Sequence, residues 1–149
     1  MICTFFGHRD TPEAIEPILY ATLVDLIENK NVDSFYVGNH GMFDSLVRKV
    51  LKQLKFSYPH INYAVVLAYM PSKSATSIFK DISETVYPEG VEKIPPKYAI
   101  IERNRWMTDR SDYVVTYVKY TIGGAVKVKS LAEKKGKIVL NLSDFNKPF

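Results

Sequence analysis

The fold is decided by the stretch Thr4-Phe5-Phe6-Gly7-His8-Arg9-Asp10, in which an apolar strand runs directly into a polar turn. In an open α/β sheet, ligands bind at the carboxyl ends of the strands, where such a loop leads into the first helix. Gly7 allows a ligand to approach the backbone, and Arg9 offers a rigid fork of donors that suits a phosphate. The stretch therefore predicts a phosphate site. A charge pair between Arg9 and Asp10 or a neighbouring carboxylate is the structural alternative.

The rest of the chain alternates strand-like and helix-like segments. Apolar runs predict strands at 1–6, 34–37, 62–69, 85–87, 113–118 and 137–142, and helical periodicity predicts helices at 12–29, 43–54, 99–107 and 123–135. The segment 70–96 is expected to be mainly loop, with a short helix around Ile78. Strands separated by helices indicate parallel pairing with right-handed crossovers. We therefore expect an α/β fold, a doubly wound, mainly parallel sheet of five or six strands with helices on both faces.

The first helix has a clear start signal in Thr11-Pro12-Glu13. The signal combines a hydroxyl N-cap, a proline at the first helical position and an acid in the first turn. Pro17 follows in the second turn, and it has no N–H to donate. It predicts either a slight kink or a late start of the helix.

Length and composition indicate one domain spanning residues 1–149. Apolar residues make up 46% of the chain and charged residues 24%, as in soluble globular proteins. No apolar run approaches the roughly 20 residues of a membrane span, so no membrane partner is expected. Cys3 is the only cysteine, which excludes an internal disulfide. We expect a buried Cys3 thiol and a cytoplasmic protein.

The net charge of +4 and the pI near 9.0 suit a polyanionic partner. Five of the lysines gather on or just after the last predicted helix: Lys127, Lys129, Lys134, Lys135 and Lys137. Lysines near a helix C-terminus complement the helix dipole and keep the surface solvated. We favour this solvated face over a nucleic-acid patch.

A second strand-to-helix loop has the pattern Gly38-x-x-Gly41-x-x-Asp44. Backbone N–H groups and the helix dipole make this position an anion site. The pattern lacks the G-x-G start of the dinucleotide fingerprint, and it follows the second strand instead of the first. Asp44 has a structural alternative as a first-turn acid or helix cap. His40 either faces the ligand or is solvated.

A third loop contains Gly123-Gly124 before the last helix, where glycines let a phosphate or sugar approach the helix N-terminus. Upstream, Arg103 shares the apolar side of its predicted helix, so we expect its guanidinium to point toward the ligand edge of the sheet. A charged group on an apolar face needs a partner. The candidates are Asp109, Asp112 and a ligand phosphate.

The order of these motifs resembles the SLOG superfamily. The matching segments are Phe6-Gly7-His8-Arg9, Gly38-x-x-Gly41-x-x-Asp44, Arg103-Asn104-x-Trp106-Met107 with Ser111-Asp112-Tyr113-Val114-Val115, and Gly123-Gly124. This Rossmann-like superfamily includes the DNA-processing protein Smf/DprA and the LOG phosphoribohydrolases. The Tyr87-Pro88-x-Gly90 segment is similar to that of its small bacterial and phage YpsA/YoqJ-like members. The resemblance spans nearly the whole chain and implies a doubly wound sheet that binds a nucleotide or a nucleotide-derived ligand.

The chain departs from the LOG pattern P-G-G-x-G-T-x-x-E, whose glutamate serves N-glycosidic cleavage. Val126, Lys127 and Ser130 stand at the positions of its third glycine, threonine and glutamate. Four extra residues, 119–122, also separate the strand from the glycine pair. Arg103 matches the arginine of the LOG R-K-x-x-M segment, while Asn104 replaces its lysine. The resemblance therefore implies a phosphate-holding framework without the hydrolytic acid.

The leading hypothesis is binding or sensing of a nucleotide or sugar-phosphate ligand at the C-terminal edge of the sheet. The expected ligand-binding residues are Gly7, His8, Arg9, Gly38, Gly41, Asp44, Arg103, Asn104, Gly123 and Gly124. One alternative is a nucleotide N-glycosidic hydrolase, which needs another carboxylate such as Asp10, Asp44 or Glu102. A second alternative is single-stranded DNA binding as in Smf/DprA. It fits the pI but lacks aromatics interleaved with Arg and Lys.

No cofactor is expected, and the catalytic residues of any reaction remain unassigned. A metal site is not expected either, because His8, His40 and His60 show no ligand spacing. The expected partner is a small nucleotide-like molecule, with nucleic acid as the less favoured partner. We also expect a homo-oligomer.

Overall fold

The computed structural model describes residues 1–68, 85–86, 88, 93–120 and 123–145. Its six strands form one sheet in which every neighbouring pair is parallel. The strands are β1 (Ile2–Gly7), β2 (Ser34–Val37), β3 (Asn62–Val66), β4 (Thr85–Val86), β5 (Tyr113–Tyr117) and β6 (Ile138–Asn141), in the order β4-β3-β2-β1-β5-β6. The predicted α/β class with a doubly wound, Rossmann-like sheet is confirmed.

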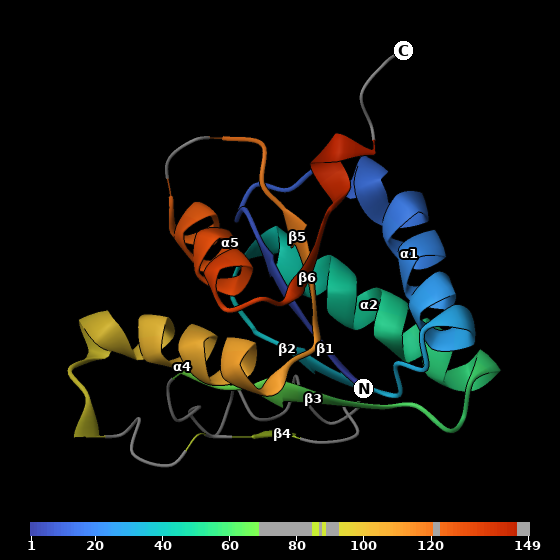
Figure 1. The fold of residues 1–149 in the computed structure, drawn as a ribbon, viewed down its shortest axis with the longest axis horizontal. Helices are drawn as coiled ribbons and strands as arrows, with labels where there is room; N and C mark the ends of the chain where they lie inside the picture. Colours follow the sequence, from blue (N-terminus) through green and yellow to red (C-terminus); the bar gives the residue numbers. More distant parts are fainter. Residues whose placement is uncertain (69–84, 87, 89–92, 121–122, 146–149) are drawn as a thin grey trace.

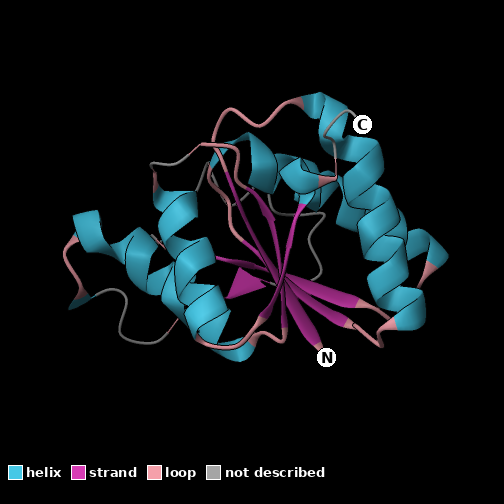
Figure 2. Ribbon diagram, turned by 45° about the horizontal axis from the view of Figure 1, so that its top comes forward, coloured by secondary structure: helices cyan, strands magenta, loops and turns pink. Residues whose placement is uncertain are grey.

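Helices cover both faces of this sheet, as Figures 1 and 2 show. The four described α-helices are α1 (Glu16–Asn29), α2 (Gly41–Ser57), α4 (Pro96–Arg110) and α5 (Gly124–Lys134). Helices α1 and α2 share one buried cluster with one face of the sheet, and α4 and α5 share a second cluster with the other face. The arrangement follows from right-handed crossovers that leave β1 and β5 toward opposite edges of the sheet.

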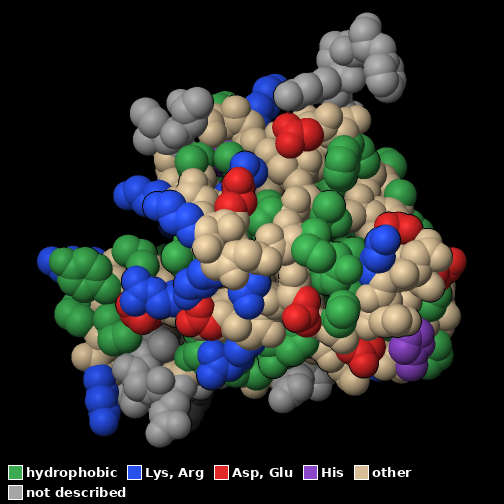
Figure 3. All heavy atoms as spheres, in the orientation of Figure 1, with side chains coloured by type: hydrophobic (Ala, Val, Ile, Leu, Met, Phe, Trp, Pro, Cys, Tyr) green, Lys and Arg blue, Asp and Glu red, His purple; other side chains and the backbone are tan. Residues whose placement is uncertain are grey.

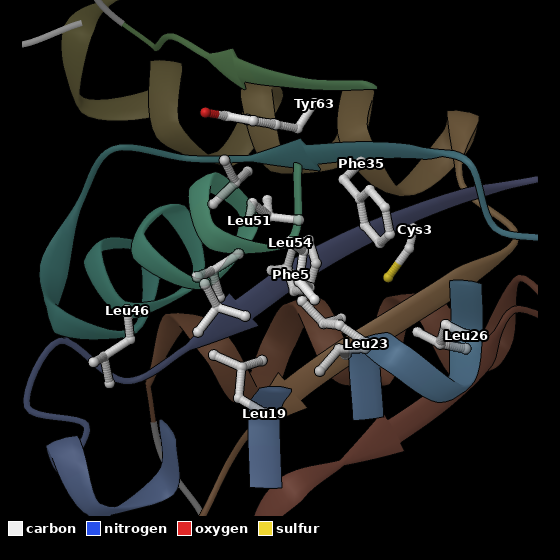
Figure 4. Close-up of a cluster of buried hydrophobic side chains, with 14 of the residues drawn as sticks. Cys3, Phe5, Leu19, Leu23, Leu26, Phe35, Leu46, Leu51, Leu54 and Tyr63 are labelled. Atoms are coloured by element: carbon white, nitrogen blue, oxygen red, sulfur yellow. The ribbon is translucent and has the colours of Figure 1, made fainter. Parts of the chain in front are cut away.

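The core between the sheet and helices α1 and α2 is built from alternating inward-facing residues (Figure 4). Phe5 and Phe35, on adjacent strands, stack with ring centroids 6.0 Å apart. Leu23 of α1 and Leu54 of α2 are fully buried in the same cluster. Cys3 is also fully buried, and this burial raises the pKa of its thiol far above the ordinary value. The predicted buried thiol is confirmed.

The strand order reverses between β1 and β5. Their register pairs Phe6 with Thr116 and Gly7 with Tyr117, so both strands end at the same level. From there the chain leads through α1 to β2 on one side and through α5 to β6 on the other. Such a switch point opens a crevice at the carboxyl ends of the strands, where open α/β sheets bind ligands.

The first helix begins late, as Pro17 predicted. A 3₁₀ turn, η1 (Glu13–Ile15), comes first, and α1 begins at Glu16 with Pro17 at its second position, where no N–H is needed. The expected N-cap role of Thr11 is wrong. Its hydroxyl instead donates to the carbonyl of His8 at 2.6 Å, which closes the turn after β1.

Other boundaries differ by a few residues. Strand β3 ends at Val66, three residues before the predicted end. The N–H of Leu67 nevertheless still donates to the carbonyl of Val86 at 2.8 Å. The predicted strand near 85–87 is confirmed at Thr85–Val86, whereas the helix expected around Ile78 lies outside the described residues. None of the helices in the described ranges has the length and apolar character that spanning a membrane requires.

Candidate functional site

A cleft of about 420 Å³ opens at the carboxyl ends of β1 and β5. Several residues expected from the sequence line it: Gly7, His8, Arg9, Asp44, Arg103, Asn104, Gly123 and Gly124. The loops after β1 and β5, the start of α2 and the middle of α4 all contribute to its walls. Three strand-to-helix loops thus converge on one site.

Gly38 and Gly41 do not line the cleft but support its walls. Gly41 has a φ of 87°, and a Cβ there would lie 2.8 Å from the Cα of Arg9. A Cβ at Gly38 would lie 2.6 Å from Oδ2 of Asp44 and 2.7 Å from Nη1 of Arg103. These glycines therefore let the β1 loop and the charged side chains pack closely. They make no surface that a ligand contacts in the described cleft.

Helix α5 begins at the cleft. Its N-cap is Gly123, whose φ of 134° only glycine adopts readily, and no side chain among the described residues caps the helix. The first-turn N–H groups of a helix have no intrahelical partner, and the dipole favours negative charge there. At Gly124 an added Cβ would meet nothing within 4 Å, so protein packing does not explain this glycine. The site has the properties of an anion-binding helix terminus.

Arg9 also lines this cleft, and its side chain is exposed. Within the described residues, no ion pair joins Arg9 to Asp10 or Asp44, so the structural alternative for this loop is wrong. Asp10 instead accepts a hydrogen bond from the Tyr120 hydroxyl at 3.3 Å. Arg9 is therefore exposed at the cleft without a carboxylate ion-pair partner among the described residues.

Arg103 is 4% exposed and lines the cleft from α4, as its position on the apolar side predicted. Its Nε and Nη2 donate to Oδ1 of Asn104 at 3.1 and 2.9 Å. Its Nη1 donates to Asn39 Oδ1 at 3.4 Å and lies 3.3 Å from Nδ1 of His40. The guanidinium is thus fixed in orientation before any ligand arrives.

The two carboxylates predicted to partner Arg103 are engaged elsewhere. Asp109 pairs with Lys135, and Asp112 accepts the N–H of Ile2 at 3.0 Å. That part of the prediction is wrong, because Asp109 lies in the last turn of α4 and Asp112 just before β5, away from the cleft. A phosphate partner for Arg103 stays a prediction.

Asp44 is buried beneath the cleft and caps α2. Its Oδ2 accepts the backbone N–H of His40 at 3.0 Å, which confirms the structural role considered for it. Burial raises the pKa of Asp44, although the charges of Arg103 and Arg48 and the His40 hydrogen bond act to lower it. Asp44 therefore combines a capping role with a position at the cleft.

His8 joins the loop after β1 to the loop after β5. Its Nε2 accepts the backbone N–H groups of Lys119 at 2.9 Å and Tyr120 at 3.3 Å. Burial lowers the pKa of His8, while the nearby charge of Asp10 acts to raise it. The neutral imidazole with its proton on Nδ1 is the form that accepts these bonds. The walls of the switch-point crevice are thus tied together by one side chain.

Sequence reasoning missed Tyr120 and the apolar lining residues Ile100, Ala125 and Val128. The ring of Tyr120 lies 4.5 Å from that of His8 and lines the cleft. Tyr120 falls within the extra residues 119–122 that separate β5 from the glycine pair, and this insertion was the available signal. His40, left open between ligand and solvent, is half-buried at the cleft. Burial, and then the charges of Arg103, Arg9 and Arg48, lower its pKa.

The site combines the start of α5 and the exposed Arg9 side chain with the buried Asp44 and Arg103 side chains. In the described part of the chain, no three His, Cys, Asp or Glu side chains gather in an arrangement that holds a metal ion. A scan against protein-family models and a search of the curated proteins found no match to the chain.

Proposed function

We propose that the protein binds a nucleotide or nucleotide-derived ligand in this cleft, with a phosphate at the first turn of α5. The observation that carries the proposal is the uncapped start of α5 at Gly123-Gly124, which shares the cleft with the Arg9 guanidinium. Backbone donors, a helix dipole and a forked cation together match a phosphate better than a carboxylate or a neutral ligand.

The dimensions and composition of the cleft support a small organic phosphate. Its volume of about 420 Å³ falls in the usual range for small-molecule sites. The side chains of Phe6, Ile100 and Val128 provide apolar surface beside the charged groups. Such a mixture suits a ligand with one charged end and a less polar remainder. Membership of the SLOG superfamily is part of the same proposal, and it rests on the order of the sequence motifs.

The basic surface gives less support to a DNA-binding function. Lys129 pairs with Glu133 at 2.9 Å, and Lys135 pairs with Asp109. On the face drawn in Figure 3, Lys and Arg side chains are interspersed with Asp and Glu. Phosphate-backbone binding draws instead on clustered, unneutralised cations.

A hydrolytic alternative has one observation in its favour. Of the carboxylates considered as replacements for the missing acid, Asp10 and Asp44 line the cleft, whereas Glu102 pairs with Arg105 at 3.0 Å. The pKa of Asp44 is raised by burial, which suits a general acid. Its cap on α2 explains its burial equally well, so binding is the better-supported function.

The test is a thermal-shift screen with AMP, ADP, cyclic AMP, ADP-ribose, NAD and adenosine. A ligand that binds only the folded state at about 100 times its Kd stabilises it by about 2.7 kcal/mol, which raises Tm by on the order of 5–10 °C. We expect a rise with at least one phosphorylated compound and none with adenosine at the same concentration. If none of the phosphorylated compounds raises Tm, or if adenosine raises it equally, the proposal is wrong.

A further inference from the structure

Tyr120 is an exposed aromatic residue held in a fixed position at the cleft. It is 53% exposed and lines the cavity. Its hydroxyl donates to Oδ2 of Asp10 at 3.3 Å, and its backbone N–H donates to Nε2 of His8 at 3.3 Å. Contacts from the loop after β1 therefore fix both the backbone and the ring of this residue.

The ring of His8 supports that of Tyr120. The two centroids are 4.5 Å apart with an interplanar angle of 38°, and His8 is itself buried. An exposed ring that is already ordered loses little conformational entropy when a ligand covers it. Together the two rings form a preorganised aromatic surface, which we name the Tyr120–His8 platform.

The platform lies in the same cleft as the proposed phosphate site. Tyr120 is followed, after two residues, by the Gly123-Gly124 pair at the start of α5. A ligand held by its phosphate at α5 therefore has a flat aromatic surface within the same cavity. Nucleobases are planar, and aromatic side chains stack on them without requiring a particular hydrogen-bonding pattern.

We propose that the Tyr120–His8 platform stacks against the nucleobase of the ligand, so that the site selects nucleotides over sugar phosphates without a base. This inference rests on the proposed function, because it takes the phosphate to be bound at α5. Stacking on an aromatic side chain contributes roughly 5- to 150-fold to affinity per base. The base, and not the phosphate alone, then determines which cellular phosphates occupy the cleft.

The experiment compares AMP with ribose 5-phosphate by isothermal titration calorimetry. The wild-type protein is expected to bind AMP roughly 5- to 150-fold more tightly. Tyr120→Leu removes the aromatic face and is expected to abolish that preference by weakening AMP alone. Tyr120→Phe keeps the ring while losing the hydrogen bond to Asp10, and it is expected to retain most of the preference. Tyr98→Leu is the matched control, since Tyr98 is 48% exposed on α4 and does not line the cleft.

The possible results separate this inference from the proposed function. Equal affinities of the wild type for AMP and ribose 5-phosphate overturn the platform while leaving the phosphate site intact. A Tyr120→Leu protein that loses affinity for both ligands in the same proportion also overturns the platform. That result would mean that the Tyr120 ring maintains the shape of the site and does not contact the base. If neither ligand binds the wild type, the phosphate site fails for AMP and ribose 5-phosphate, and the platform fails with it.

Discussion

Nε2 of His8 accepts a hydrogen bond from the backbone N–H of Lys119 at 2.9 Å, and this bond joins the loops that follow β1 and β5. These two strands lie on either side of the switch point, where their chains lead away in opposite directions. Only an unprotonated Nε2 can accept the bond. The geometry of the cleft therefore depends on the neutral form of a buried histidine.

Stability is expected to fall as the pH falls below about 6.5. The folded-state pKa values of His8 and His40 are lowered by burial, so the unfolded chain binds more protons in this range. As the pH falls from about 6.5 through the lowered folded-state pKa values, protonation therefore favours the unfolded chain. Below those pKa values the loss of stability from these histidines is complete. Thermal melts between about pH 7.5 and about pH 5 measure the effect.

A His8→Gln variant tests how much of this pH dependence of stability comes from His8. The glutamine oxygen can accept the Lys119 N–H but cannot be protonated, so the slope of Tm against pH is expected to become shallower. His60→Gln, at an exposed position after α2, serves as the matched control and is expected to keep the wild-type slope. A His8→Gln protein with an unchanged slope would contradict the neutral-acceptor role.

Gly7→Ala is expected to destabilise the protein by about 1–3 kcal/mol. An added Cβ would overlap the ring of Phe43, a residue of α2 that is fully buried in the core. Urea denaturation measures the loss, and Gly7→Ala is expected to cost less in a Phe43→Ala background, which removes the two nearest atoms, Cγ and Cδ2. A Gly7→Ala protein with the wild-type denaturation midpoint would contradict the expected overlap between the added Cβ and Phe43.

Gly124→Ala is expected to have the opposite outcome, because a Cβ there meets nothing within 4 Å. Its stability should equal or slightly exceed that of the wild type, since alanine is the better helix former. The methyl group would stand in front of the first turn of α5, so nucleotide affinity is expected to fall at least about tenfold. Calorimetry and a melting curve on the same sample separate the two effects. Unchanged affinity would show that the phosphate does not bind at this turn.

Release of free base from AMP by the purified protein is expected to be low or absent. Val126, Lys127 and Ser130 stand where the LOG pattern has glycine, threonine and glutamate. Chromatographic detection of adenine measures the rate, with Asp44→Asn as the comparison. Rapid release that Asp44→Asn abolishes would assign the acid to Asp44 and establish the hydrolytic alternative.

The fold was predictable because local signals agreed with one another along most of the chain. The Phe43-to-Leu54 periodicity predicted α2, and the glycine pair predicted the start of α5 to within one residue. Thr11 misled because its hydroxyl has two possible partners, a helix N–H and the His8 carbonyl, and tertiary packing decides between them. The end of β3 was misplaced because an apolar run does not show where its pairing partner ends.

The sequence allowed the loops of the site to be predicted, but not the side-chain contacts between one loop and another. Sheet topology brings the ends of β1, β2 and β5 to one edge, so Gly7, Arg9 and Gly124 could be grouped from the sequence. The contact of His8 with Tyr120 spans more than a hundred residues and depends on how one loop folds over another. The partners of Arg103 were missed for the same reason, since Asn39 and His40 belong to the loop after β2 and meet α4 only at the carboxyl edge of the sheet.

The most direct measurement is the affinity and the melting temperature of Arg9→Ala, determined with AMP on one preparation. A charge-assisted contact to phosphate contributes on the order of 1.5–3 kcal/mol, so the account predicts a roughly ten- to hundredfold loss of affinity with an unchanged Tm. Arg9→Lys should recover only part of the affinity, because it keeps the charge and loses the fork. Arg105→Ala, which removes an exposed arginine outside the cleft, should bind as the wild type does. An Arg9→Ala protein that melts at a lower temperature yet binds AMP normally would contradict the phosphate site.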